Sequence, residues 1–171
     1  MEIRHYPDPV LRQSTEAVAA FDQALANLAA EMLRTMRAAE GLGLAAPQIG
    51  VSRRIAIVAS SDKPGQETVL VNPELVAASG WEDQSEEGCL SFPGVYIRIG
   101  RFTSVRVRHQ DLQGQTREME AQGILARAVQ HELDHLDGRL LVDRMSPVQR
   151  LAQRRRLRDL ESRFDRRTAA V

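Results

Sequence analysis

The segment His131-Glu132-Leu133-Asp134-His135 constrains the fold of this chain more than any other. In an α-helix of about 3.6 residues per turn, residues four positions apart lie about 40° apart around the axis, so both rings can reach one ion from the same face. Glu132 then lies beside the ion, where it can take a proton from water. The pattern therefore predicts a metal-binding helix over residues 122–136 and hydrolytic chemistry.

This motif also has a plain structural alternative. The chain contains four histidines in 171 residues, and two of them can fall at this spacing on an ordinary amphipathic helix. A catalytic metal site usually has three protein ligands and an open position for water. The metal interpretation therefore depends on a third ligand elsewhere in the chain.

Cys89 is the only cysteine. Since an isolated cysteine cannot form an internal disulfide, it is a buried hydrophobic residue, a reactive nucleophile or a metal ligand. Gly88 before it lets the backbone approach a ligand closely, and the flanking residues 86–91 are polar rather than a core run. Together with the helix, these features favour a metal site formed by Cys89, His131 and His135.

Residues 41–50 read Gly-Leu-Gly-Leu-Ala-Ala-Pro-Gln-Ile-Gly. The segment follows a predicted helix and precedes a predicted strand, so it lacks the strand, glycine turn and helix order of a nucleotide-binding loop. A plain hairpin or turn is one alternative. Gln48 instead favours a functional role for this segment, because an amide donor among small residues can stabilise a developing oxyanion.

Together the three segments resemble peptide deformylases, which remove the formyl group from the N-terminal formylmethionine of new proteins. The family motifs Gly-x-Gly-x-Ala-Ala-x-Gln, Glu-Gly-Cys-x-Ser and His-Glu-x-x-His match residues 41–48, 87–91 and 131–135, in this order and without a departure. The likeness extends to residues 7–12 and to the pair Asn72-Pro73. It covers most of the chain except its C-terminal end.

The resemblance implies that Cys89, His131 and His135 hold one divalent ion and leave a fourth position for water. Sulfur and imidazole ligands suit zinc and permit ferrous iron, cobalt or nickel. The family favours Fe²⁺ in the cell, with Zn²⁺, Ni²⁺ or Co²⁺ as substitutes. Glu87 and Asp134 are candidates to orient the ligand histidines, and exposed carboxylates are the alternative.

The resemblance also assigns the catalytic groups. Glu132 would take a proton from water, whose pKa the ion lowers from about 15.7 toward about 7, and would return it to the leaving amine. The Gln48 side chain and the Leu90 backbone N–H would stabilise the tetrahedral oxyanion. The reaction would release formate and a free methionyl N-terminus.

Substrate contacts are expected from two kinds of group. Backbone groups would pair with an extended peptide as an added strand, and those expected to do so belong to Leu42, Gly43 and Gly88. An apolar pocket would take the methionine side chain, and its expected lining residues are Ile124 and Ala128. The expected substrates are nascent formyl-Met polypeptides.

Periodicity predicts an α+β fold, with mostly antiparallel sheets around a central metal-binding helix and with a C-terminal helix. Apolar residues at helical spacing predict a helix over residues 22–39, and a proline after Ser146 predicts another that runs to about residue 164. Strands are predicted over residues 54–59, 68–71, 96–99, 104–108 and 115–121. The residues of the metal-binding helix expected to face the core are Ile124, Leu125, Ala128 and Val129.

Length and charge suggest one domain with two chemically different parts. Residues 1–146 would form the catalytic part, and residues 147–171 a basic helix and tail of the same domain. Net charge is zero, but residues 1–143 carry 14 basic and 20 acidic side chains, whereas residues 144–171 carry nine arginines and three acids. The basic end is either a solvated helix face or, as the family resemblance implies, a surface for ribosomal RNA.

No apolar run approaches the length of a membrane span, and the N-terminus lacks a signal pattern. A cytoplasmic protein without a membrane partner is therefore expected, and the expected oligomeric state is a monomer.

Two other functions share part of the pattern. A zincin-like metallopeptidase commonly recruits a ligand downstream of its helix, but no histidine follows His135. A non-catalytic metal-stabilised binding module needs a fourth protein ligand, for which no second cysteine exists.

Overall fold

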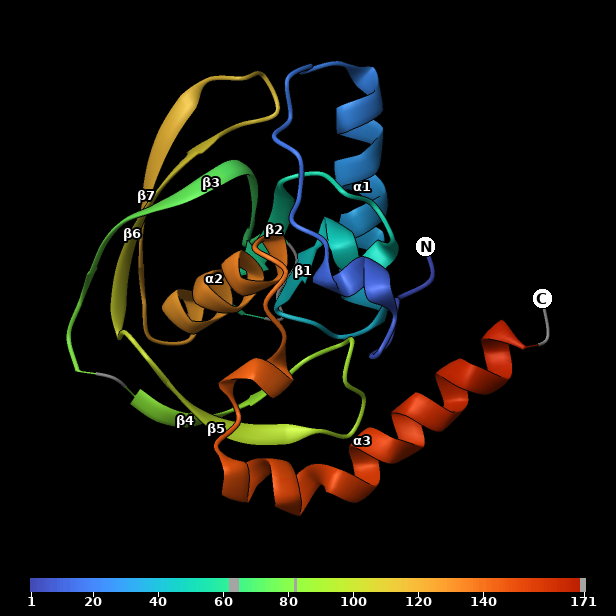
Figure 1. The fold of residues 1–171 in the computed structure, drawn as a ribbon. Helices are drawn as coiled ribbons and strands as arrows, with labels where there is room; N and C mark the ends of the chain where they lie inside the picture. Colours follow the sequence, from blue (N-terminus) through green and yellow to red (C-terminus); the bar gives the residue numbers. More distant parts are fainter. Residues whose placement is uncertain (62–64, 82, 170–171) are drawn as a thin grey trace.

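The computed structural model describes residues 1–61, 65–81 and 83–169 and has the expected α+β fold (Figure 1). Antiparallel strands form a larger sheet in the order β1-β2-β3-β6-β7 and a smaller sheet of β4 and β5. The strands are β1 (Gly43–Ala45), β2 (Ile55–Ala59), β3 (Glu67–Ser79), β4 (Asp83–Gly88), β5 (Tyr96–Arg101), β6 (Ser104–Gln110) and β7 (Thr116–Gln122). The helices are α1 (Gln23–Ala38), α2 (Gly123–Leu136) and α3 (Pro147–Thr168), with 3-10 helices η1 (Pro9–Arg12), η2 (Ala46–Ile49) and η3 (Leu141–Arg144).

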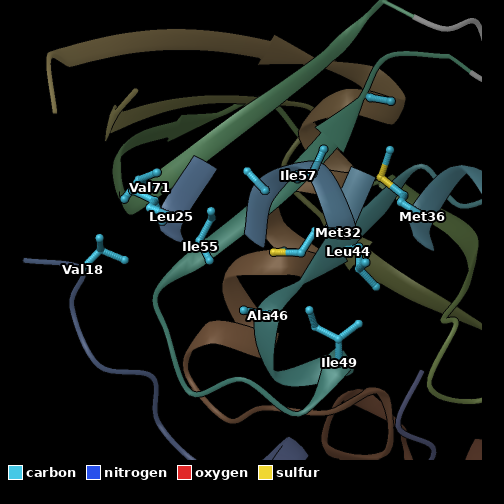
Figure 2. Packing of buried hydrophobic residues seen from close by; sticks show 12 residues of the cluster. Val18, Leu25, Met32, Met36, Leu44, Ala46, Ile49, Ile55, Ile57 and Val71 are labelled. Atoms are coloured by element: carbon cyan, nitrogen blue, oxygen red, sulfur yellow. The ribbon is translucent and has the colours of Figure 1, made fainter. Parts of the chain in front are cut away.

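Strand β2 is buried on both faces because helices cover both sides of the larger sheet. Successive side chains of a strand point to opposite faces. Ile55 and Ile57 pack in one cluster with Met32 of α1 (Figure 2), whereas Val58 packs with Val129 of α2 in another. The central position of α2, expected for the metal-binding helix, follows from this layering.

The core-facing side of α2 differs in part from the prediction. Val129 is buried as expected, and Leu125 and Ala128 are partly buried. The prediction for Ile124 is wrong, because this residue is 57% exposed. The reason is geometric: Ala126 and Val129 define the buried face, and a residue two positions before Ala126 lies about 200° away around the helix.

Strand β3 is longer than the predicted segment, which ended before Asn72 and Pro73. In the structure Asn72 takes a positive φ of 50°, and the register with β6 shifts between Val71 and Glu74, after which pairing continues to Ser79. The Asn72 side chain stabilises this bulge by bonding both the N–H and the C=O of Val18, at 2.8 and 2.9 Å. The bulge therefore absorbs the Asn-Pro pair without ending the strand.

Helix α3 begins after Ser146 as predicted, where the Ser146 hydroxyl accepts the N–H of Gln149 at 3.2 Å. It continues beyond the predicted end, to Thr168. Its buried residues, Leu157 and Leu160, join a hydrophobic cluster with Leu11, Phe92 and other residues around the smaller sheet. Within the described residues, no helix combines the length and apolar character needed to cross a lipid bilayer.

Candidate metal centre

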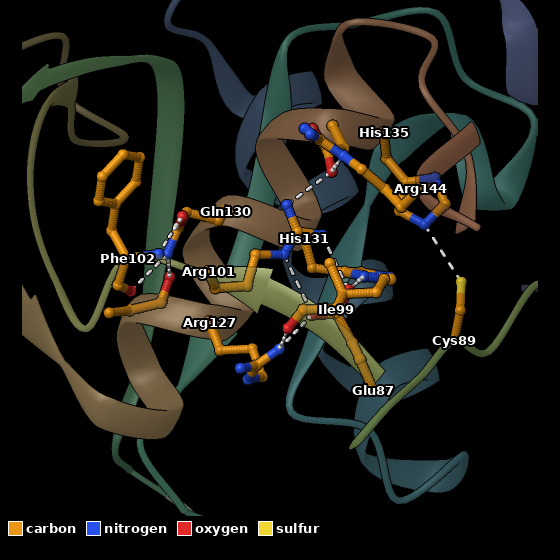
Figure 3. A network of polar contacts seen from close by, with 12 residues as sticks. Glu87, Cys89, Ile99, Arg101, Phe102, Arg127, Gln130, His131, His135 and Arg144 are labelled. Atoms are coloured by element: carbon orange, nitrogen blue, oxygen red, sulfur yellow. Dashed lines mark hydrogen bonds and ion pairs between the residues drawn. The ribbon is translucent and has the colours of Figure 1, made fainter. Parts of the chain in front are cut away.

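Helix α2 and the end of β4 bring the three predicted ligands together. His131 and His135 lie one turn apart on α2, and Cys89 directly follows β4. One ligand atom from each residue lies within 4.8 Å of the others. The Cys89 sulfur is 3.2 Å from Nε2 of His135 (Figure 3).

The arrangement fits a divalent transition-metal ion. Nδ1 of His131 lies 2.6 Å from Oε1 of Glu87, so Nε2 of the same ring remains for an ion. One thiolate and two imidazoles suit zinc, iron, cobalt or nickel, and three protein ligands leave one tetrahedral position open. These residues therefore form a Cys/His/His metal site of the catalytic kind.

A buried arginine fixes the carboxylate behind His131. Arg101, whose side chain is 5% exposed, bonds Glu87 through two nitrogens at 3.1 and 2.8 Å and Asp134 through the third at 2.8 Å (Figure 3). Arg127 adds a bond to Glu87 at 3.1 Å. Burial alone would raise the pKa of Glu87, but the bonds from His131 and Arg101 outweigh it and hold that pKa below its ordinary value.

The two acidic residues predicted to orient the histidines behave differently. Glu87 contacts His131 directly. Asp134 pairs instead with Arg101 and with Arg144 of η3, and the described residues show no bond from Asp134 to a ligand histidine. At about 100° per residue, Asp134 lies about 60° around the helix from His131 and about 100° from His135, and its carboxylate is directed to Arg101 and Arg144. Asp134 therefore contributes to the network through its pairing with Arg101, which in turn bonds Glu87.

Glu132 lies next to the ligands in a buried environment. The residue is 3% exposed, and burial raises the pKa of its carboxyl group to about 7, although His131 opposes the rise. Among the described residues, its Oε2 has no hydrogen-bond partner. Gly43 of β1 permits this position, because a Cβ built on Gly43 would lie 2.2 Å from Oε1 of Glu132. An unsatisfied, buried carboxylate beside a metal site is suited to accept a proton.

Gln48, in η2, directs its amide toward the same site. Its Oε1 accepts the N–H of Ala45 at 2.8 Å, and its Nε2 donates to Ser91 Oγ at 3.2 Å and lies 3.7 Å from the Cys89 sulfur. In the described part of the chain, the N–H of Leu90 makes no backbone hydrogen bond. The N–H of Leu90 is thus available near the ligands, and the Gln48 amide lies beside them with one N–H group on Ser91 and the other on the side of the Cys89 sulfur.

The predicted substrate contacts lie at two unpaired sheet edges and on α2. Gly43 starts β1, the edge strand of the larger sheet, and Gly88 ends β4, an edge of the smaller sheet. The carbonyl of Leu42 already accepts the N–H of Ala59 at 2.8 Å, so its N–H is the group left for a peptide. The exposed Ile124 lies one helical turn before the partly buried Ala128.

Sequence reasoning missed Arg101 and did not assign Ser91. A signal for Arg101 was present, because inward positions of β5 alternate and Arg101 follows Ile97 and Ile99 in that series. An arginine at an inward strand position needs a buried acidic partner. Ser91 is fully buried and lies inside a recognised motif, but only its contact with Gln48 indicates what it does.

Comparisons with known proteins agree with this geometry. The family described as Polypeptide deformylase matches residues 1–151. Peptide deformylase of Thermotoga neapolitana is 42% identical over 158 residues, which cover 92% of this chain and 94% of that protein. Peptide deformylase of Thermodesulfovibrio yellowstonii is 46% identical over 152 residues, covering 88% and 92%. The crystal structure of Arabidopsis thaliana peptide deformylase 1B with an inhibitor superposes with a TM-score of 0.94 at 37% identity, covering 99% of this chain and 94% of that one.

Proposed function

This chain belongs to the peptide deformylase family and is a metal-dependent hydrolase that removes the N-formyl group of formylmethionine, and we propose that Glu132, Gln48 and Leu90 carry out the reaction. The observation that supports these roles most is the placement of Glu132, which is buried beside the ligands with an unpartnered oxygen. A bound divalent ion would act as a Lewis acid and lower the pKa of water from about 15.7 toward about 7.

The protein groups would then divide the reaction between them. Glu132 accepts the proton of the attacking water as the water oxygen adds to the formyl carbon. The amide of Gln48 and the N–H of Leu90 donate to the carbonyl oxygen while it carries negative charge. Glu132 then gives the proton to the amine as the C–N bond breaks, and formate leaves.

Substrate binding would use the two free edges that flank the metal site. An extended peptide placed between β1 and β4 can bond the backbone of Leu42, Gly43 and Gly88, which gives affinity with little sequence preference. Ile124 and Ala128 would contact the methionine side chain, and exposure of Ile124 suits a residue at the mouth of a pocket. Nascent formyl-Met polypeptides are thus the proposed physiological substrates.

Formate release from a formyl-Met tripeptide tests the activity. We expect stoichiometric formate and free amine, with no cleavage of an unformylated peptide of the same sequence. Gln48→Ala should lower kcat about 10²- to 10³-fold with little change in KM, because its donor acts mainly on the charged oxygen. Cleavage of internal peptide bonds would support the zincin-like alternative, and metal binding without any turnover would support the binding module.

For the ion we propose Fe²⁺ in the cell, with Zn²⁺, Ni²⁺ and Co²⁺ as substitutes. The support is the mixed sulfur and imidazole donor set, which accepts each of these ions. Protein purified without oxygen should contain iron in proportion to its activity. Full activity in preparations that contain zinc and no iron would overturn the assignment.

We also propose that α3 contacts ribosomal RNA and that the protein works as a cytoplasmic monomer. The support is a cluster of exposed arginines on α3, which includes Arg154, Arg155 and Arg158. Arginines that contact phosphates make binding fall with salt, by about one unit of log–log slope per contact.

Cosedimentation with ribosomes tests this surface. Changing Arg154, Arg155 and Arg158 together to Gln should weaken association and flatten its salt dependence, while short formyl peptides are still hydrolysed. The matched control changes three exposed arginines of the main body, Arg34, Arg53 and Arg106, and so alters net charge equally. Equal loss in both triple variants would show that only overall charge matters.

A further inference from the structure

An N-terminal segment outside the three motifs contacts both Gln48, the proposed oxyanion donor, and Ser91, which accepts a hydrogen bond from the Gln48 amide. The N–H of Arg4 donates to the C=O of Gln48 at 2.7 Å, and the N–H of Tyr6 donates to the C=O of Ser91 at 2.9 Å. Gln48 and Ser91 are also joined directly, because Gln48 Nε2 donates to Ser91 Oγ at 3.2 Å. Residues 4–6 thus bridge η2, which carries Gln48, and the turn that carries Ser91, and the contact between these two residues orients one amide group.

This bridge is anchored at Tyr6. The Tyr6 ring stacks on Phe92, the neighbour of Ser91, with centroids 4.9 Å apart. The Tyr6 hydroxyl donates to Oε1 of Glu161 in α3 at 3.0 Å. Figure 1 shows the N-terminus and the C-terminal end of α3 on the same side of the molecule. The ring and the hydroxyl therefore hold the segment from two directions.

Gln48 needs such anchors for two reasons. It lies in η2, a four-residue 3-10 helix with little rigidity of its own. Its amide nitrogen also carries two N–H groups. With Ser91 Oγ accepting one of them, the other is directed toward the side of Cys89, whose sulfur lies 3.7 Å away. A donor stabilises a transition state best when its direction is set in advance.

We propose that Ser91 and Tyr6 are positioning residues for the oxyanion donor Gln48. Ser91 orients the amide of Gln48 directly. Tyr6, held between Phe92 and Glu161, fixes the backbone of Ser91 and, through Arg4, that of Gln48. This proposal rests on the oxyanion role proposed for Gln48, and it adds two residues that act only through it.

Kinetics in two backgrounds test the proposal on the metal-loaded, full-length protein. Ser91→Ala and Tyr6→Leu should each lower kcat about 2- to 10-fold, the loss typical of one hydrogen bond, with unchanged KM and metal content. In a Gln48→Ala background neither change should lower kcat further, because residues that act as one unit are not additive. Tyr6→Phe keeps the ring stack and should have a smaller effect of the same kind.

A control separates positioning from stability. Leu157→Ala removes a side chain from the hydrophobic cluster that Tyr6 packs against, without a bond to Gln48 or Ser91. It should lower the melting temperature and leave kcat unchanged in both backgrounds. Ser91→Ala and Tyr6→Phe remove one oxygen each, so the test stands even if Tyr6→Leu does not fold.

The outcomes distinguish two failures. If Gln48→Ala itself leaves kcat unchanged, the oxyanion role is wrong, and the positioning proposal falls with it. If Gln48→Ala lowers kcat but Ser91→Ala and Tyr6→Phe lower it by the same factor in both backgrounds, the positioning proposal alone is wrong. Loss of the ion in the Ser91 or Tyr6 variants would likewise overturn it, because the effect would then run through the metal site.

Discussion

Arginines occupy opposite settings in the metal centre and in α3. Arg101 is almost fully buried, and its nitrogens bond the carboxylates of Glu87 and Asp134. Arg154, Arg155 and Arg158 of α3 are exposed, and the described residues contain no ion pair that involves them. A buried charge must be paired in fixed geometry, whereas exposed charges stay hydrated and act through the longer-range field.

This difference indicates which of the two regions can tolerate substitutions. The network around Arg101 holds the Glu87 carboxylate that contacts His131, so a change in this network would shift a metal ligand. Helix α3 contributes two buried leucines and two glutamine side chains, Gln149 and Gln153, that donate to carbonyls of β5 at 2.7 and 3.0 Å. The outward face of α3 adds charge to the molecule without shaping the site.

The largest effect is expected at Glu132. Glu132→Gln removes the proposed proton acceptor but keeps the shape of the side chain, so kcat should fall about 10²- to 10⁴-fold with the ion retained. Cys89→Ala should instead lose the ion and the activity together. Metal content by elemental analysis and turnover of a formyl-Met peptide check both. A Glu132 variant that loses its ion would contradict the division between ligand and base.

Arg101→Met should have the next largest effect, because it leaves Glu87 and Asp134 buried without their shared partner. Removing one partner of a buried pair typically costs about 3–5 kcal/mol of unfolding free energy. Loosening a residue behind a metal ligand also weakens metal binding about 10- to 100-fold. Chemical unfolding and competition with a chelator measure the two effects. Wild-type ion affinity in a folded Arg101 variant would show that Glu87 needs no support from Arg101.

Gly43→Ala tests how closely β1 must approach Glu132, the proposed proton acceptor. The added methyl group would overlap Glu132, since its position lies 2.2 Å from Oε1. Displacing a catalytic group by about 1 Å can cost 10²-fold in rate, so we expect a fall of about that size in kcat. Circular dichroism and metal analysis should show a folded, loaded protein. Normal kcat would mean that Glu132 can act from a second position.

The smallest effect is expected from Arg155→Met on α3, the counterpart of Arg101→Met. An exposed charge with no partner contributes little, so the unfolding free energy should change by no more than about 0.5 kcal/mol. Hydrolysis of a short formyl peptide should be unchanged. A loss of stability comparable with that of Arg101→Met would remove the contrast between the two regions.

The elements that could be predicted are those with a strong local pattern. Helices α1, α2 and α3 lie where periodicity and the Ser146-Pro147 start placed them. Strands β1 and β4 were not predicted, because β1 is very short and β4 is mostly polar and lacks β-branched residues. These strands exist because β2 and β5 pair with them, which is a tertiary property.

The sequence by itself determined the metal ligands and the family, because the two histidines have a fixed helical spacing and each of the three motifs, including the one that carries Cys89, is a local pattern of particular residue types. Only the tertiary structure decided that Glu87 and not Asp134 contacts a ligand histidine, and that Arg101 joins these two carboxylates. The physical reason is burial. Which charges must be paired depends on segments far apart in the chain that fold into one low-dielectric site, and local spacing does not record that pairing.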